Sequence, residues 1–358
     1  MSETLFLRVA EIVKETSDAI TIHFEQPERP VSYLSGQYLT LICDIDGKEE
    51  RRCYSLCSAS CADRFLSVTV KRVEGGKVSN YLIDNLKPGD TLSALPPMGN
   101  FYFVRKEESK EAVMIGGGSG ITPLFSMIKS ILSEEPHVRV NLLYVNSSRD
   151  NTIFYTELEE WRARYSERFR IVYYWSEDWK EKEHKSGFFS RLFKKKEDHR
   201  LNESRLISVL DEWGIQRGNK AEFYVCGPQG LMDMVLRTLH GLGYNEETIH
   251  KESFYTELDT SAVAASDTEY VITVRYKGKD YEVKVPAGTS ILEAGLDQGF
   301  DLAYSCQNGD CGSCISRCLS GTVTMLTTEA LSERELKEGY ILPCVGYPQS
   351  DDVVVEFR

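Results

Sequence analysis

The sequence contains no long run of apolar residues, and its basic residues do not outnumber its acidic residues. No stretch of its 358 residues approaches the roughly 20 consecutive apolar residues of a membrane span. The N-terminus also lacks the basic start and apolar centre of a signal peptide. We therefore expect a cytoplasmic protein without a transmembrane segment. The net charge of −13 argues against nucleic acid as a partner, because a protein that binds phosphate backbones should be basic.

The composition divides the chain into regions with different patterns. In residues 1–105, short alternating strands separated by Gly and Pro predict an antiparallel β-barrel or sandwich. In residues 106–255, strands alternate with helices, which predicts an α/β domain with a parallel sheet. Residues 256–268 are small, polar and acidic and form a predicted linker. Residues 269–358 begin with a strand–turn–strand pattern and a helix for which Ser290 is a plausible N-cap.

Four of the ten cysteines follow one recognisable spacing. Four residues separate Cys306 from Cys311, two separate Cys311 from Cys314, and 29 separate Cys314 from Cys344. Plant-type [2Fe–2S] ferredoxins use this C-x₄-C-x₂-C pattern followed by a distant cysteine. A zinc site would normally show two close pairs, and structural disulfides are uncommon in the cytosol. The spacing therefore favours an iron–sulfur cluster over zinc or disulfides. Cys318 would lie roughly 13 Å farther along a strand, so we expect a buried apolar role for it.

A second candidate site is the stretch RRCYSLCSA, residues 51–59. It precedes Lys71, Arg72 and Ser79, where a helix could start. Cationic side chains beside a helix N-terminus suit a pyrophosphate. Tyr54 could cover a flat ring, and Ser55 could hydrogen-bond to a ring nitrogen. The cysteines at every fourth position of this region, Cys53, Cys57 and Cys61, could also suggest zinc, but no histidine or further thiol accompanies them, and we interpret them as residues that bind no metal.

Two further motifs fall at the ends of predicted strands in the α/β region. GGGSGITP, residues 116–123, joins a strand to a helix and lets a pyrophosphate approach the backbone at the helix N-terminus. YVCGP places Cys226, Gly227 and Pro228 at the end of another strand. Ligands of open α/β sheets bind at the carboxyl ends of strands. Cys226 is therefore expected beside whatever binds the glycine turn.

Together these motifs resemble the ferredoxin–NADP⁺ reductase superfamily, fused to a C-terminal plant-type ferredoxin of the β-grasp, α+β type. The same layout is found in reductase components of multicomponent oxygenases, such as those of phenylacetyl-CoA epoxidases and 3-ketosteroid 9α-hydroxylases. The resemblance implies catalytic roles for Ser55 and Cys226. It implies flavin contacts from Arg52, Cys53, Tyr54, Ser55, Val70, Lys71, Arg72, Gly76, Lys77, Val78, Ser79 and Phe254. It implies nucleotide contacts from Gly117, Gly118, Ser119, Gly120, Thr122, Arg149, Cys226, Gly227 and Pro228. It implies cluster ligation by Cys306, Cys311, Cys314 and Cys344.

The expected function is electron transfer from NADH or NADPH through FAD and a [2Fe–2S] cluster to a partner oxygenase or another one-electron acceptor protein. The coenzyme stays open, because Arg149 suits the 2′-phosphate of NADPH whereas Glu177 suits the free ribose of NADH. Two alternatives also stay open: an NAD(P)H oxidase or redox sensor without a protein acceptor, and a zinc-stabilised binding module. The charged insertion at 179–200 is expected to be a solvated loop, with a docking patch as the alternative.

Overall fold

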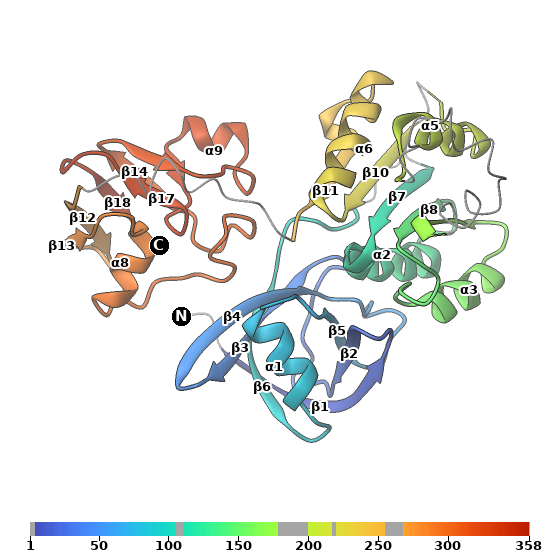
Figure 1. The fold of residues 1–358 in the computed structure, drawn as a ribbon, viewed down its shortest axis with the longest axis horizontal. Helices are drawn as coiled ribbons and strands as arrows, with labels where there is room; N and C mark the ends of the chain where they lie inside the picture. The colour runs from blue at the N-terminus through green and yellow to red at the C-terminus, as the bar shows by residue number, and fades with distance from the viewer. Residues whose placement is uncertain (1–3, 105–109, 178–199, 217–219, 255–267, 358) are drawn as a thin grey trace, which may run out of the picture. The chain divides into compact units, whose positions relative to one another are not determined.

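The computed structural model describes residues 4–104, 110–177, 200–216, 220–254 and 268–357. The described chain forms two compact units (Figure 1): the first contains the described residues up to Phe254 except Arg51–Cys53, and the second contains Arg51–Cys53 and the described residues after Phe254. The predicted linker at 256–268 and the charged insertion at 179–200 lie, except for their last residues, outside the described residues.

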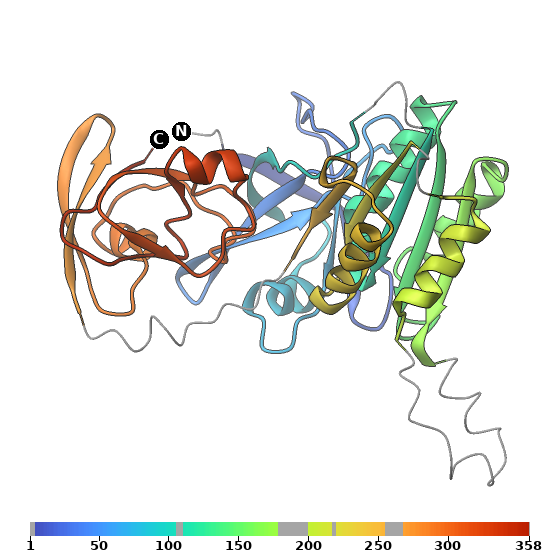
Figure 2. The ribbon, with the colours of Figure 1, turned by 90° about the horizontal axis from the view of Figure 1, so that it is seen from above.

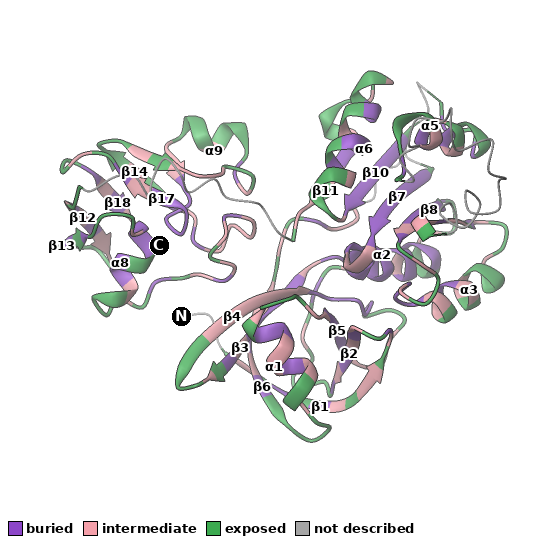
Figure 3. Ribbon diagram, in the orientation of Figure 1, coloured by how far each residue is buried: buried purple, intermediate pink, exposed green. Residues whose placement is uncertain are grey.

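The first unit begins with a six-stranded sheet in the order β4-β3-β6-β1-β2-β5. Its strands are β1 (Leu5–Lys14), β2 (Ala19–Phe24), β3 (Tyr38–Ile45), β4 (Lys48–Ser55), β5 (Leu66–Lys71) and β6 (Thr91–Met98). Neighbours pair antiparallel. An antiparallel bridge between Leu56 and Val68 returns the chain after β4 to β5, so the sheet curls into the predicted barrel. Buried side chains such as Ile22, Leu39 and Val68 form its core, and Figure 3 colours parts of these strands as buried.

Helix α1 (Lys77–Asn85) follows β5 and packs on the barrel. Its N-cap is Gly76, so the helix starts two residues before the predicted start at Ser79. The Ser79 hydroxyl instead accepts a hydrogen bond from the Val73 amide at 3.2 Å. This bond stabilises the turn that precedes the helix.

The remainder of the first unit is a five-stranded parallel sheet in the order β11-β10-β7-β8-β9, as predicted. Its strands are β7 (Glu111–Gly117), β8 (Arg139–Asn146), β9 (Phe169–Trp175), β10 (Ala221–Cys226) and β11 (Ile249–Glu252). Helices α2 (Ile121–Glu134) and α3 (Tyr155–Arg164) cover one face, and α5 (Glu203–Glu212) and α6 (Gln229–Gly241) the other (Figure 2). Successive side chains of β7 alternate between the faces: Met114 packs with α2, and Val113 and Ile115 pack with α5 and α6.

The second unit is a mixed sheet in the order β13-β12-β18-β14-β16 with a separate β15-β17 pair. Its elements are β12 (Tyr270–Tyr276), β13 (Lys279–Val285), α8 (Ile291–Asp297), β14 (Ser316–Ser320), β15 (Val323–Met325), α9 (Glu333–Lys337), β16 (Tyr340–Ile341), β17 (Gly346–Pro348) and β18 (Val354–Glu356). The hairpin β12–β13, the helix α8 and the parallel pairing of β12 with β18 match the predicted α+β ferredoxin fold. Ser290 is the N-cap of α8, as predicted, and accepts from the Glu293 amide at 3.2 Å.

Candidate active site and iron–sulfur site

The first site forms where the barrel meets the carboxyl edge of the parallel sheet. Ser55, at the end of β4, is buried and donates a hydrogen bond from Oγ to Oε2 of Glu252 at 3.1 Å. Glu252 ends β11 and lies in register with Cys226, which ends β10. The two predicted catalytic residues, Ser55 and Cys226, are therefore both neighbours of one carboxyl group.

Sequence reasoning missed Glu252. Its strand has four residues and no alternation of apolar and polar side chains, so no local pattern predicts it. The available signal was an acidic residue two positions before Phe254, in the segment where the chain was expected to return to the flavin.

Burial sets the protonation of this group of residues. It raises the pKa of Glu252 to about 8, although the hydrogen bond from Ser55 opposes the shift. Burial, with the Glu252 charge as a smaller cause, raises the pKa of the Cys226 thiol well above its usual range. At neutral pH, therefore, Cys226 is a neutral thiol and a poor nucleophile. Glu252 holds a proton on a carboxyl group that is hydrogen-bonded to Ser55.

The glycine turn lies against Cys226. Residues 118–120 form a single 3₁₀ turn, and α2 begins at Ile121. A Cβ on Gly120 would lie 2.1 Å from the Cys226 carbonyl oxygen, so no larger residue fits there. The Tyr144 hydroxyl donates to the Gly118 carbonyl at 3.0 Å, and the Thr122 hydroxyl donates to the Ser119 carbonyl at 2.9 Å. These bonds hold the turn in place, and the N-terminus of the helix that follows it, α2, suits a pyrophosphate.

The predicted cationic residues lie near this turn but already have partners. Lys71 ends β5, and its Nζ is 3.6 Å from a carboxylate oxygen of Asp18. Arg72 donates to Asn80 at 2.8 Å and to Asp84 at 3.1 Å, both on α1. The guanidinium of Arg72 is therefore held by its own helix, and Lys71 is the more direct candidate for a flavin phosphate.

The other predicted contact residues lie on the same elements. Arg52, Cys53 and Tyr54 are partly buried on β4, and Lys77 pairs with Glu50 at 3.0 Å. The buried members are Val70, Val78, Ser79, Gly117 and Thr122. In the loop after β8, the Arg149 guanidinium lies 4.5 Å from the ring centroid of Tyr155. Phe254 is 44% exposed, which leaves its ring available to a ligand.

The second site is the cysteine loop of the second unit. A chain of thiol contacts joins Cys311 to Cys306, Cys306 to Cys344, and Cys344 to Cys314, the last pair at 3.3 Å between sulfurs. Hydrogen bonds between the paired thiols lower the pKa values of Cys311 and Cys314 and raise those of Cys306 and Cys344, so one thiol of each pair is shifted toward the thiolate that ligates metal. All four predicted ligands therefore converge.

The backbone of this loop fits an iron–sulfur cluster. The Cys306 amide donates to the Cys311 sulfur at 3.4 Å, and the Asn308 amide donates to the Cys306 sulfur at 3.4 Å. Such bonds to cysteine sulfur help to set a cluster's potential. Gly309 has φ of +80°, and a Cβ there would lie 2.4 Å from Thr327, so the tight loop requires glycine.

Cys318 differs from the expectation in one respect. It lies on β14, as predicted, but it is only partly buried, and its thiol donates to the Ser320 carbonyl at 3.2 Å. It packs against the core of the second unit, but it lies near the end of the five-residue strand β14, at the point where the register with β18 shifts.

Comparison with known protein families identifies three domains. Residues 6–103 match the oxidoreductase FAD-binding domain, residues 114–237 the oxidoreductase NAD-binding domain, and residues 274–349 the 2Fe-2S iron-sulfur cluster binding domain. Fold and sites thus define an oxidoreductase that combines flavin, nicotinamide and iron–sulfur modules. Among the described residues, no helix is long and apolar enough to cross a membrane.

The chain belongs to the ferredoxin–NADP⁺ reductase superfamily, in the group that carries a C-terminal plant-type ferredoxin. It is 35% identical over 359 residues to a component of the 1,2-phenylacetyl-CoA epoxidase of Escherichia coli K12, covering 98% of this chain and 97% of that protein. It is 31% identical to the ferredoxin reductase component of a 3-ketosteroid-9-alpha-monooxygenase of Rhodococcus rhodochrous, covering 99% and 97%. The solved structure of phthalate dioxygenase reductase aligns with a TM-score of 0.62 at 26% identity, covering 99% and 98%.

Proposed function

We propose that this protein is the reductase component of a multicomponent oxygenase, which passes electrons from NAD(P)H to FAD, to a [2Fe–2S] cluster and then to a partner oxygenase. The observation that carries the proposal is the pairing of two complete sites on one chain: the Ser55–Glu252–Cys226 centre beside the glycine turn, and four convergent thiols with amides directed at their sulfurs. The curated relatives, which are components of epoxidase and monooxygenase systems, support an oxygenase as the acceptor.

The domains we propose are residues 1–105 for FAD, 106–255 for the nucleotide and 269–358 for the cluster, with 256–268 as the linker. Arg52, Tyr54, Ser55 and Lys71 with the start of α1 would hold FAD. Gly117–Thr122 and Cys226–Pro228 would hold the nucleotide. When bound, FAD accepts two electrons from NAD(P)H and releases them singly to a one-electron carrier such as the cluster.

The residues of the first site position these groups and hold a proton. Gly120 lets the glycine turn pack directly against the Cys226 carbonyl, and the Cys226 side chain is fully buried, so the turn is held at the carboxyl edge of the sheet where a flat ring would bind. Ser55 keeps its hydroxyl within 3.1 Å of a Glu252 carboxyl that is protonated at neutral pH. The pair can therefore donate a proton to a nitrogen that becomes basic as a bound ring is reduced.

The proposal is tested by anaerobic titration of the purified protein with NADH and with NADPH, followed by absorbance and electron paramagnetic resonance. We expect bleaching of flavin absorbance and appearance of a reduced-cluster signal. A colourless protein would support the zinc-stabilised binding module instead. Rapid oxygen consumption without any acceptor, with no stimulation by an oxygenase such as a phenylacetyl-CoA epoxidase, would support the stand-alone oxidase.

A further inference from the structure

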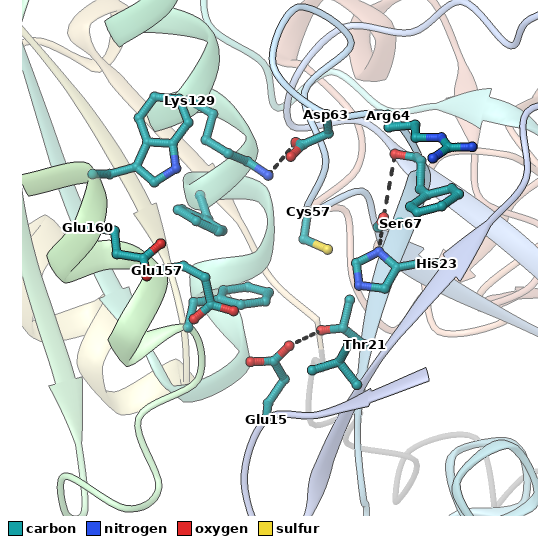
Figure 4. A pocket seen from close by; sticks show the side chains of 15 residues that line it. Glu15, Thr21, His23, Cys57, Asp63, Arg64, Ser67, Lys129, Glu157 and Glu160 are labelled. Atoms are coloured by element: carbon teal, nitrogen blue, oxygen red, sulfur yellow. Dashed lines mark hydrogen bonds and ion pairs between the residues drawn. The ribbon is translucent and has the colours of Figure 1, made fainter. Parts of the chain in front are cut away.

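A cavity of about 210 Å³ lies between the barrel and the parallel-sheet domain, within the first unit and apart from the sites above. Its barrel wall comes from the end of β1 and the residue after it, from β2 and β5, and from the segment between β4 and β5. Its other wall comes from α2 and the first two turns of α3 (Figure 4). None of the residues assigned above to flavin, nucleotide or cluster lines it. The electron-transfer function does not account for it.

The walls combine aromatic rings with carboxylates. Phe125 of α2 and Phe154 before α3 are in contact, with ring centroids 4.7 Å apart, and Phe65 and Trp161 add two further rings. Glu15 extends from the barrel side and Glu157 from α3, and Figure 4 shows their carboxyl groups directed into the same space. Rings with nearby negative charge recognise organic cations.

The positive groups of the cavity are already engaged. Lys129 forms a part-buried ion pair with Asp63 and also lies 4.5 Å from the ring centroid of Phe125, and the Arg64 guanidinium lies 5.2 Å from the ring centroid of Phe65. Within the described part of the chain, by contrast, neither Glu157 nor Glu160 forms an ion pair. The cavity therefore has an uncompensated negative charge.

We propose that this cavity is a binding site for a small organic ammonium ion, whose apolar part packs on Phe154 and Trp161 while its charged nitrogen lies between Glu15 and Glu157. This proposal is independent of the electron-transfer function. Because the ligand would contact both the barrel and α3, its binding should stabilise the packing of the two domains.

Protonation of Glu15 gives the site a distinctive signature. Burial raises the pKa of Glu15 to about 7, opposed by the hydrogen bond from Thr21 and reinforced by the nearby Glu157 charge; the Phe154 amide also faces it. A bound cation favours the ionised carboxylate, so binding should release a proton. His23 on β2, whose pKa burial lowers, is neutral at higher pH and does not oppose a cation there. Affinity should therefore rise between about pH 6 and about pH 8.

The experiment is isothermal titration of the FAD-loaded, full-length protein with three compounds of one shape and different charge: benzylammonium, benzyl alcohol and benzoate. We expect saturable one-to-one binding of benzylammonium, with proton release measured in two buffers of different ionisation enthalpy. Benzyl alcohol should bind about fivefold more weakly, because it lacks one partly exposed ionic contact, which contributes up to about 1 kcal/mol of binding free energy. Benzoate should not bind.

Variants locate the site. Glu157→Gln should weaken benzylammonium binding by about fivefold. Glu15→Gln should weaken it similarly and should in addition abolish the proton release that accompanies binding. Glu212→Gln, on the exposed end of α5, should change neither and serves as the matched control. Retained flavin absorbance and an unchanged melting profile check that each variant folds. Equal affinities for the cation and the alcohol, no saturable binding of the cation, or an unaltered Glu157→Gln protein would each overturn the proposal.

Discussion

The buried carboxyl group of Glu252 makes a quantitative prediction about stability. Its pKa in the folded protein is raised from 4.5 to about 8. Below about pH 4.5 the carboxyl is protonated in both the folded and unfolded states and has no effect. Between the two pKa values the folded state keeps a proton that the unfolded state releases. Stability contributed by this group is therefore lost as pH rises.

The size of the effect follows from the shift. Each pKa unit corresponds to about 1.4 kcal/mol, so at about pH 8 the shift of Glu252 costs about 4 kcal/mol of unfolding free energy. Glu252→Gln carries no charge at any pH and can still accept the hydrogen bond from Ser55. We expect the variant to match the native protein at low pH and to exceed its stability progressively as pH rises.

The assay is urea unfolding of the FAD-loaded protein at several pH values, followed by the fluorescence of released flavin, which reports on the first unit. Glu15, whose pKa is also raised, adds a similar slope, but it does so in both proteins and cancels in their difference. Glu212→Gln is the control for loss of one carboxylate at the surface. Parallel curves for the native protein and Glu252→Gln from about pH 5 to about pH 8 would refute the reasoning.

Four further outcomes are expected. Alanine at Cys306, Cys311, Cys314 or Cys344 should abolish the cluster, measured as iron and acid-labile sulfide per chain, whereas Cys318→Ala should retain it. FAD-loaded Cys311→Ala should still reduce ferricyanide with NAD(P)H at a near-normal rate but lose cytochrome c reduction; equal loss of both would contradict the linear order. Gly120→Ala should lower the unfolding free energy by about 2 kcal/mol, because its Cβ meets the Cys226 carbonyl; a neutral result would contradict that contact. Arg149→Ala should raise KM for NADPH about tenfold while KM for NADH changes less, as initial rates would show.

Elements with a clear local period were predictable from the sequence. The short strands predicted in residues 1–105 form the antiparallel sheet β1–β6, and the helices of the parallel-sheet domain follow its strands in the predicted order. The start of α1 was not predictable, because Ser79 has the chemistry of an N-cap but its hydroxyl bonds to the turn before the helix. Whether a serine caps a helix depends on the backbone of that turn, which the sequence pattern does not reveal.

The two sites differ in how far their spacing determines them. Three of the proposed cluster ligands lie in one nine-residue loop, so sequence distance already limits their separation in space. Ser55, Cys226 and Glu252 lie far apart in the sequence and meet only because β11 pairs with β10 and the end of β4 reaches the same edge. Ser55 and Cys226 were predicted from the family resemblance. Glu252 was identified only from the structure, where the register of a four-residue strand places it beside Cys226.

That register explains why Glu252 can be protonated where a surface glutamate would be charged. Cys226 and Glu252 are partners on adjacent parallel strands, so the side chains beside the carboxyl group are a thiol and the Ser55 hydroxyl rather than a lysine or arginine. With no cation to favour the carboxylate, burial dominates and the proton stays. A lysine or arginine at position 226 would reverse this balance, and the Ser55–Glu252 pair would then accept a hydrogen bond without having a proton to give.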